Sequence, residues 1–179
     1  MAVIFTIGHS THTISEFINL LLAYEIRRLI DIRSIPKSRH NPQFNEPELG
    51  GSLKASDVEY IRLPSMGGLR RTSKRSVNTG WKNASFRGFA DYMQTEEFRE
   101  GIERLRVLAQ KTSVIMCAEA VPWRCHRSLI GDALIIRGEF VKHIYGAHTA
   151  KEHQLTPFAK VDGLTLTYPE PDEDSHQCP

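Results

Sequence analysis

The residues best suited to chemistry lie just after apolar runs that are typical of β-strands. They are His9 and Ser10 after the first run, Asp31 and Arg33 at the end of the second, and Glu119 after the fourth. In parallel α/β sheets, ligands bind beyond the carboxyl ends of the strands. We therefore expect these side chains to share one polar cleft.

Asp31 and Glu119 form a candidate pair of catalytic carboxylates. Two carboxylates over one cleft could divide general-acid and general-base or nucleophile roles, as in the cleavage of glycosidic bonds. His9 is the third catalytic candidate. The alternative is structural, with one carboxylate neutralising Arg33 or Arg127 and the other capping a helix. The sequence leaves both a hydrolase or transferase and a structural ion pair open.

Arg127 indicates an anion-binding site, because it lies in the first turn of a predicted helix. The free N–H groups there favour negative charge, so an arginine is unfavourable unless an anion or a carboxylate lies nearby. A bound phosphate would satisfy both the arginine and the helix, and so would an ion pair with Glu119 or Asp31. The candidate phosphate- and substrate-binding residues are Ser10, Arg33, Gly67, Gly68, Cys125, His126 and Arg127.

The three cysteines, Cys117, Cys125 and Cys178, are an odd number, which argues against a disulfide framework. Phosphatases and rhodaneses place an arginine six residues after a catalytic cysteine. Here the sixth residue is Trp123 after Cys117 and Gly131 after Cys125, so the spacing fails. We place Cys117 in the core and treat Cys125, which has arginines on both sides, as the candidate reactive thiol.

No metal or cofactor is expected from the sequence. His9, Cys117, Cys125 and His126 could in principle be assembled into a metal site, but none of them belongs to a spaced Cys or His pair. The chain also lacks the glycine-rich patterns of standard ATP- and dinucleotide-binding proteins.

A basic stretch without acidic residues follows the third predicted strand. Its candidate nucleic-acid-binding residues are Arg70, Arg71, Lys74, Arg75 and Lys82. Trp81 and Phe86 lie close by, and basic residues interleaved with aromatic ones suit phosphate contacts and base stacking. The alternative is a solvated loop beside the cleft.

Strands and helices alternate along the sequence. The expected strands cover residues 3–7, 28–32, 58–63, 113–117 and 140–144, and the expected helices cover about 13–24, 86–111 (one helix or a pair) and 125–137. This order predicts an α/β fold, a single-domain three-layer sandwich with a mostly parallel sheet of Rossmann-like or doubly wound type. The domain covers residues 1–160, with a long loop at 35–57 and an insertion-like basic loop at about 69–87. An acidic tail, 161–179, is expected to be flexible.

The composition is that of a globular protein, with 40% hydrophobic and 25% charged residues in 179. No apolar run approaches the roughly 18 residues of a membrane span, and the N-terminus lacks the basic lead of a signal peptide. We expect a cytoplasmic protein without a membrane partner. The oligomeric state is not predicted.

Ordered motifs along the chain resemble those of the family called domain of unknown function 488. They are Thr6-Ile7-Gly8-His9-Ser10, Asp31-Ile32-Arg33 with Pro36 and Ser38, Tyr60 with Leu63-Pro64, Gly67-Gly68, Cys117-Ala118-Glu119, Cys125-His126-Arg127, His143-Ile144 and His153-x-Leu155-Thr156. The resemblance covers about residues 3–159. It implies an α/β fold and marks the same strand-end residues, but it implies no activity.

Three functional hypotheses follow from these residues. The first is an enzyme that hydrolyses, or transfers a group from, a phosphorylated small molecule, nucleotide or nucleic acid in the strand-end cleft. The second is a non-catalytic module that binds nucleic acid or a partner through the basic loop. The third is a thiol-based enzyme that uses Cys125.

Overall fold

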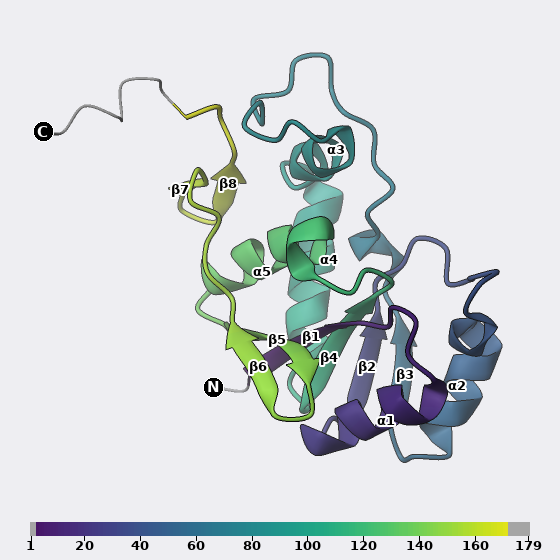
Figure 1. Cartoon of the computed structure of the whole chain (residues 1–179). Coiled ribbons are helices and arrows are strands. Elements are labelled where there is room, and N and C mark those ends of the chain that lie inside the picture. Colours follow the sequence, from purple (N-terminus) through teal and green to yellow (C-terminus); the bar gives the residue numbers. More distant parts are fainter. Residues whose placement is uncertain (1–2, 172–179) are drawn as a thin grey trace, which may run out of the picture.

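The computed structural model of the protein describes residues 3–171 and is built around one sheet (Figure 1). The strand order is β3-β2-β4-β1-β5-β6, and all neighbouring strands are parallel except β5 and β6. The strands are β1 (Val3–Gly8), β2 (Arg28–Asp31), β3 (Glu59–Arg62), β4 (Ser113–Cys117), β5 (Phe140–Gly146) and β6 (Thr149–Glu152). The predicted mostly parallel sheet is confirmed.

Helices cover both faces of this sheet. On one face, α1 (Ile14–Ala23) and α2 (Glu46–Lys54) pack over the first apolar core. On the other, α3 (Ala84–Tyr92), α4 (Glu96–Leu108) and α5 (Arg127–Ile135) enclose the second. The chain is therefore the single-domain three-layer α/β sandwich that the alternating pattern predicts.

The local sequence explains where the helices begin. Thr13 and Glu16 form a capping box at the start of α1, because the Thr13 hydroxyl accepts from the Glu16 backbone N–H and the Glu16 carboxylate accepts from that of Thr13. The buried face of α1 then presents Phe17 and Leu21 to the sheet. Thr95 caps α4 through one such bond, in which its hydroxyl accepts from the backbone N–H of Phe98.

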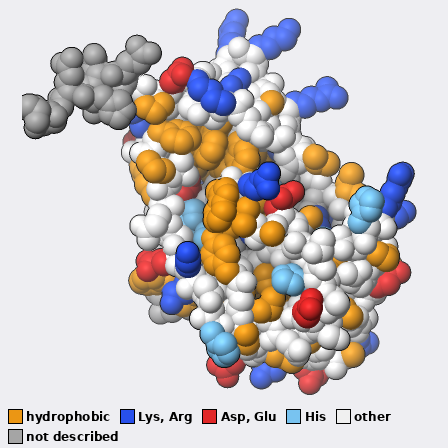
Figure 2. Space-filling view, viewed as in Figure 1, with side chains coloured by type: hydrophobic (Ala, Val, Ile, Leu, Met, Phe, Trp, Pro, Cys, Tyr) orange, Lys and Arg blue, Asp and Glu red, His pale blue; other side chains and the backbone are white. Residues whose placement is uncertain are grey.

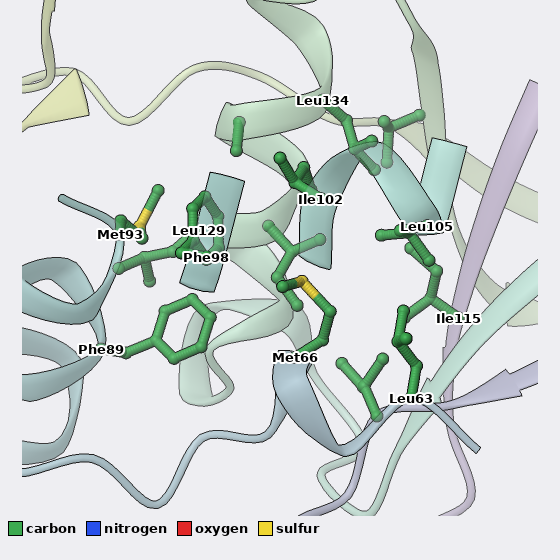
Figure 3. Close-up of a cluster of buried hydrophobic side chains, with 14 of the residues drawn as sticks. Leu63, Met66, Phe89, Met93, Phe98, Ile102, Leu105, Ile115, Leu129 and Leu134 are labelled. Carbon is green, nitrogen blue, oxygen red and sulfur yellow. The ribbon is translucent and has the colours of Figure 1, made fainter. Parts of the chain in front are cut away.

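Strand β4 lies in the middle of the sheet and is buried along its whole length. Its side chains alternate, so Ile115 belongs to the core below α3, α4 and α5, whereas Val114 belongs to the opposite core. Figure 3 shows Ile115 at the edge of a cluster that includes Leu105 and Ile102 of α4. Ile102 is fully buried, so its truncation to alanine should cost about 2–5 kcal/mol.

The segment between β2 and β3 contains more helix than the sequence indicates. Residues 35–57 were expected to form a long loop with room for one helical turn, but they contain the turn η1 (Pro42–Phe44) and the nine-residue helix α2. Two adjacent glycines lower the helical propensity of this segment. Burial of Leu49 and Leu53 compensates for them.

The C-terminal part also departs from expectation. After β6, the chain forms a separate hairpin of β7 (Lys160–Asp162) and β8 (Thr165–Thr167). Tyr168 is fully buried and donates a 2.9 Å hydrogen bond to a carboxylate oxygen of Asp132. Leu166 and Tyr168 therefore anchor this segment on the domain, and they supply apolar area that the acidic composition obscures. The remaining tail, 172–179, lies outside the described residues. Within residues 3–171, no helix combines the length and apolarity needed to cross a membrane.

Candidate functional site

A cleft of about 670 Å³ opens at the carboxyl ends of β1, β2 and β4, which are neighbours in the sheet. The predicted site residues that line it are His9, Ser10, Arg33, Gly68, Glu119, Cys125 and His126, together with Cys117. Asp31, Gly67 and Arg127 do not line it. The strand ends thus bring most of the predicted residues to one place, as the parallel topology requires.

Cys117 ends β4 and lies on the floor of this cleft, where only 3% of it is exposed. Its Sγ is 3.4 Å from Nη1 of Arg127, the first residue of α5. Arg127 is itself only 1% exposed, and its other contact is a 2.9 Å hydrogen bond from Nη2 to the carbonyl oxygen of Ala120. Its Nε has no hydrogen-bond partner within residues 3–171.

Arg127 therefore pairs with a sulfur atom rather than with a carboxylate. The sequence left open whether its anion is a bound phosphate or a carboxylate of Glu119 or Asp31, and neither carboxylate contacts it. A buried guanidinium is costly without a counter-charge. Sγ of Cys117, 3.4 Å from Nη1, would supply that charge as a thiolate.

Gly8 allows this contact to form. It is paired with Cys117 in the sheet register, and a Cβ atom at Gly8 would lie 1.7 Å from the carbonyl oxygen of Glu119 and 2.9 Å from Nη1 of Arg127. Any other residue would push the segment after β4 away from β1. The missing side chain thus provides the space in which the guanidinium of Arg127 reaches Cys117.

Cys125 lies just before α5, with its Sγ 2.9 Å from that of Cys117. Burial by itself raises the pKa of Cys117, but the hydrogen bond from Cys125 and the charge of Arg127 outweigh it and lower the pKa below its usual value. The hydrogen bond to Cys117, together with burial, raises the pKa of Cys125 well above its usual value. The more acidic thiol is therefore Cys117.

Asp31 is held in an ion pair beneath the cleft. Its carboxylate is fully buried and accepts from Nε and Nη2 of Arg33, the latter at 2.7 Å, and from the hydroxyl of Tyr60 at 2.7 Å. Burial alone would lower the pKa of Arg33, but its hydrogen bonds to Asp31 raise it. Burial and the bond to Asp31 likewise raise the pKa of Tyr60. Glu119 is exposed at the cleft, so the two carboxylates occupy very different surroundings.

His9 and His126 are buried, neutral histidines that both line the cleft. Burial lowers the pKa of each to about 4. Nδ1 of His9 donates to the carbonyl oxygen of Ser10 at 2.9 Å, and its ring stacks on Phe44. Nε2 of His126 donates to the carbonyl oxygen of Met66 at 2.9 Å, which leaves Nδ1 facing Cys125 at 3.6 Å.

The glycine pair after β3 makes room for the histidine. A Cβ at Gly68 would lie 2.5 Å from Nδ1 of His126, and one at Gly67 would lie 2.3 Å from Oγ of Ser34. These glycines thus serve close packing at the cleft wall. Ser10, which also lines the cleft, has a positive φ of 46°, which is uncommon for a residue other than glycine.

Two exposed cations at the cleft were not among the predicted site residues. Lys37 and Arg124 line it, as Glu119 does, and neither forms an ion pair within residues 3–171. Trp123, 65% exposed, is next to Arg124. Lys37 and Arg124 could have been found from the sequence because they follow strand-end residues, but many loop residues share that position.

The predicted nucleic-acid-binding side chains of the basic loop fall into two groups, those that bond to the domain and those that do not. Arg70 donates to the backbone oxygens of Gly67 and Ser65, and Lys82 pairs with Glu170. Trp81 and Phe86 stack on each other, and Trp81 also contacts Phe158 and Tyr168. These aromatic rings therefore belong to the packing of the domain.

The three remaining basic side chains, Arg71, Lys74 and Arg75, are exposed and make no ion pair within the described part of the chain. Figure 2 shows Lys and Arg side chains projecting from the loop at the top of the view. Among residues 3–171, no group of three or more His, Cys, Asp and Glu side chains is arranged to hold a metal ion.

Comparison with known proteins identifies the class of this chain. The family model described as Domain of unknown function DUF488 matches residues 13–134, and the chain belongs to that family. The matched span contains the Cys117, Cys125 and Arg127 segment. The similar motifs at residues 6–10 and 143–156 lie outside it, so their assignment stays a prediction. Neither the curated proteins nor the solved structures gave a match.

Proposed function

We propose that this protein is a thiol-dependent enzyme that hydrolyses, or transfers a group from, a phosphorylated nucleotide or nucleic-acid substrate bound in the strand-end cleft. The observation that carries the proposal is the buried guanidinium of Arg127, which contacts Sγ of Cys117 at 3.4 Å and no carboxylate within residues 3–171. A cation in this position stabilises a thiolate, the nucleophilic form of cysteine.

The surroundings of Cys117 support a covalent mechanism. Its thiolate would attack an electrophilic centre of the substrate, displace a leaving group and form a covalent intermediate. Water would then complete a hydrolysis, or a second substrate a transfer. Lys37 and Arg124 at the cleft would hold the anionic groups of the substrate.

The roles of the predicted catalytic residues change accordingly. Asp31 holds Arg33 and Tyr60, so its part is to fix the wall of the cleft. His9 is neutral, and its Nε2 accepts from Nη1 of Arg33 at 3.4 Å, so its part is to hold Arg33 at the cleft. Glu119, which is exposed at the cleft, remains available as the general acid or base.

The proposal is tested by measuring how fast iodoacetamide alkylates Cys117 between pH 5 and 9, with mass spectrometry to assign the modified residue. A thiolate at Cys117 should react at pH values where an ordinary cysteine, with a pKa of about 8.5, is largely protonated. Phosphate, nucleotides and short oligonucleotides are then added, and a ligand of the cleft should slow the reaction. Alkylation that follows an ordinary thiol and that no ligand slows would refute the proposal.

A second candidate function rests on the exposed side chains of Arg71, Lys74 and Arg75. Three free cations on a projecting loop favour contacts with the phosphates of a nucleic acid. In a non-catalytic binding module, charge reversal in this loop would abolish function and Cys117→Ser would leave it intact. In the thiol enzyme, the sensitivities are exchanged.

A further inference from the structure

The two cysteines of the cleft are placed for chemistry with each other. Cys117 is the last residue of β4 and Cys125 lies just before α5, and the intervening segment returns the chain so that their Sγ atoms are 2.9 Å apart. Both line the cleft. A disulfide bond is about 2.0 Å long, so the sulfur atoms need to approach by only about 1 Å to become bonded.

The contacts of the two thiols differ, and the difference assigns their roles. Sγ of Cys117 accepts from Nη1 of Arg127 and from the thiol of Cys125, and the protonated thiol also donates to the carbonyl oxygen of Glu119 at 3.7 Å. Cys125 accepts from the backbone N–H of Arg127 at 3.5 Å and faces Nδ1 of His126. The guanidinium of Arg127 contacts Cys117 and not Cys125, so we assign Cys117 as the nucleophile and Cys125 as its neighbouring thiol.

We propose that Cys117 is a peroxide-sensitive modification site and that Cys125 resolves its oxidised form into a disulfide. The first step rests on the thiolate of the proposed function. The sulfur of Cys117 attacks the O–O bond of a hydroperoxide, an S–O bond forms, and the alkoxide or hydroxide that leaves takes a proton from water. The sulfur loses two electrons and the peroxide gains them.

In the second step, Sγ of Cys125 attacks the sulfur of the Cys117 sulfenic acid. The S–S bond forms, the S–O bond breaks, and the departing hydroxide leaves as water with the proton of Cys125. The first step prepares the second, because the sulfenic acid is neutral. Cys125 then no longer shares its proton with a neighbouring anion, and the charge of Arg127 favours a thiolate at Cys125 instead.

Formation of the disulfide would remove the nucleophile from the cleft, and reduction by a dithiol would regenerate it. It would also protect Cys117 from further oxidation, because the sulfinic and sulfonic acids that form from an unresolved sulfenic acid are not reduced by thiols. The same pair of contacts would therefore serve as a reversible off-state of the enzyme and as protection for its catalytic sulfur.

The test uses the full chain with Cys178→Ser, which leaves only the two cleft cysteines. The reduced protein is treated with hydrogen peroxide, the remaining thiols are alkylated, and the products are identified by intact mass and peptide mapping. We expect that neither cysteine can then be alkylated and that the mass falls by two hydrogen atoms per molecule. Peptide mapping should find the Cys117 and Cys125 peptides joined by a disulfide, and dithiothreitol should restore both thiols fully.

Two further variants identify the roles. In Cys125→Ser, the sulfenic acid at Cys117 should persist and be trapped by dimedone. In Cys117→Ser, Cys125 should stay reduced at the same peroxide dose. Two outcomes would overturn the inference: irreversible oxidation of Cys117 without a disulfide, or two thiols that remain fully alkylatable after peroxide. Both outcomes are measured in the Cys178→Ser parent protein, so they do not depend on whether the other variants fold.

The alkylation profile of the reduced protein separates this inference from the proposed function. A thiolate at neutral pH without a disulfide after peroxide rejects the redox pair and leaves the thiol-dependent enzyme standing. A disulfide that forms although Cys117 titrates as an ordinary thiol rejects the proposed nucleophile and the order of the two steps.

Discussion

Arg127 and Cys117 lie ten residues apart in the sequence, yet Nη1 of the arginine is 3.4 Å from Sγ of the cysteine in the interior of the domain. Neither side chain is more than 3% exposed. Water cannot screen a charge in such a place, so the cation and the sulfur control each other's state.

Replacement of Arg127 by methionine should slow alkylation of Cys117 at pH 7. A hydrogen bond to a charged group contributes about 1.5–3 kcal/mol, and about 1.4 kcal/mol corresponds to a tenfold change. We therefore expect the rate to fall by about tenfold or more. Arg124→Met removes an exposed cation from the same segment and is the matched control. Equal effects of the two variants would show that the contact with Arg127 has no special role.

Asp31→Asn should destabilise the fold rather than change the thiol. The amide cannot neutralise the buried Arg33, and removal of one partner from a buried ion pair costs about 3–5 kcal/mol. Tyr60→Phe, which removes one hydrogen bond to the same carboxylate, should cost about 1 kcal/mol. Urea unfolding measures both. A stable Asp31→Asn protein without activity would instead restore Asp31 as a catalytic carboxylate.

Gly8→Ala should disturb the site, because the added methyl group would overlap the carbonyl of Glu119. Overpacking typically costs about 1–3 kcal/mol, and here it should also displace Arg127 and slow alkylation of Cys117. Gly51→Ala in α2 is the control, since a Cβ there meets nothing within 4 Å. It should raise stability by about 0.5–1 kcal/mol. Thermal unfolding measures the stability of both variants, and the rate of Cys117 alkylation measures whether the site is disturbed.

Acid should destabilise the protein through its buried histidines. Burial lowers the pKa of His9 and His126 to about 4 and that of His143 to about 3, from 6.5. The unfolded chain therefore binds protons between about pH 6.5 and 4 that the folded chain does not bind. Stability is fully present above pH 6.5 and falls as the pH falls, by up to about 1.4 kcal/mol per pH unit for each histidine.

Urea unfolding at pH 7, 6 and 5 measures this slope, and His143→Gln should make it shallower. His143 is buried between Thr6 and His153, to which its Nδ1 and Nε2 are hydrogen-bonded. A slope that is the same in the variant would show that His143 does not take part.

Charge reversal of Arg71, Lys74 and Arg75 to glutamate should weaken binding of single-stranded oligonucleotides if the basic loop contacts their phosphates. Each lost contact should reduce the dependence of log K on log salt by about 0.7, which fluorescence anisotropy at several salt concentrations measures. Reversal of Arg70 is no substitute, because its side chain stacks on Tyr92 and bonds the backbone. An unchanged salt dependence would exclude the loop from binding.

The sequence predicted the sheet and the strand-end cleft well, because both depend on patterns that are local. A buried run such as residues 113–117, followed by a polar loop, identifies a central strand and the edge at which ligands bind. Helix α2 was missed because its two glycines suppress a signal that burial of Leu49 and Leu53 overrides.

The chemistry within the cleft was harder to predict, because it depends on side-chain directions. A spacing of six residues from cysteine to arginine is typical of a tight loop. Here the loop contains the turn η3 (Pro122–Arg124), and Arg127 reaches Cys117 from ten residues away. Similarly, nothing in the spacing shows that Arg33 turns back on Asp31 and leaves no carboxylate oxygen free of donors.

The strand order also determines when the site can form during synthesis. The first strand, β1, lies between β4 and β5, and β2 lies between β3 and β4. Before residues 113–117 leave the ribosome, β2 and β3 are the one pair of neighbouring strands that can join. Until then β1 has no partner strand and one edge of β2 stays unpaired, and open strand edges of this kind favour aggregation. A protein truncated before β4 should therefore require a chaperone to stay in solution.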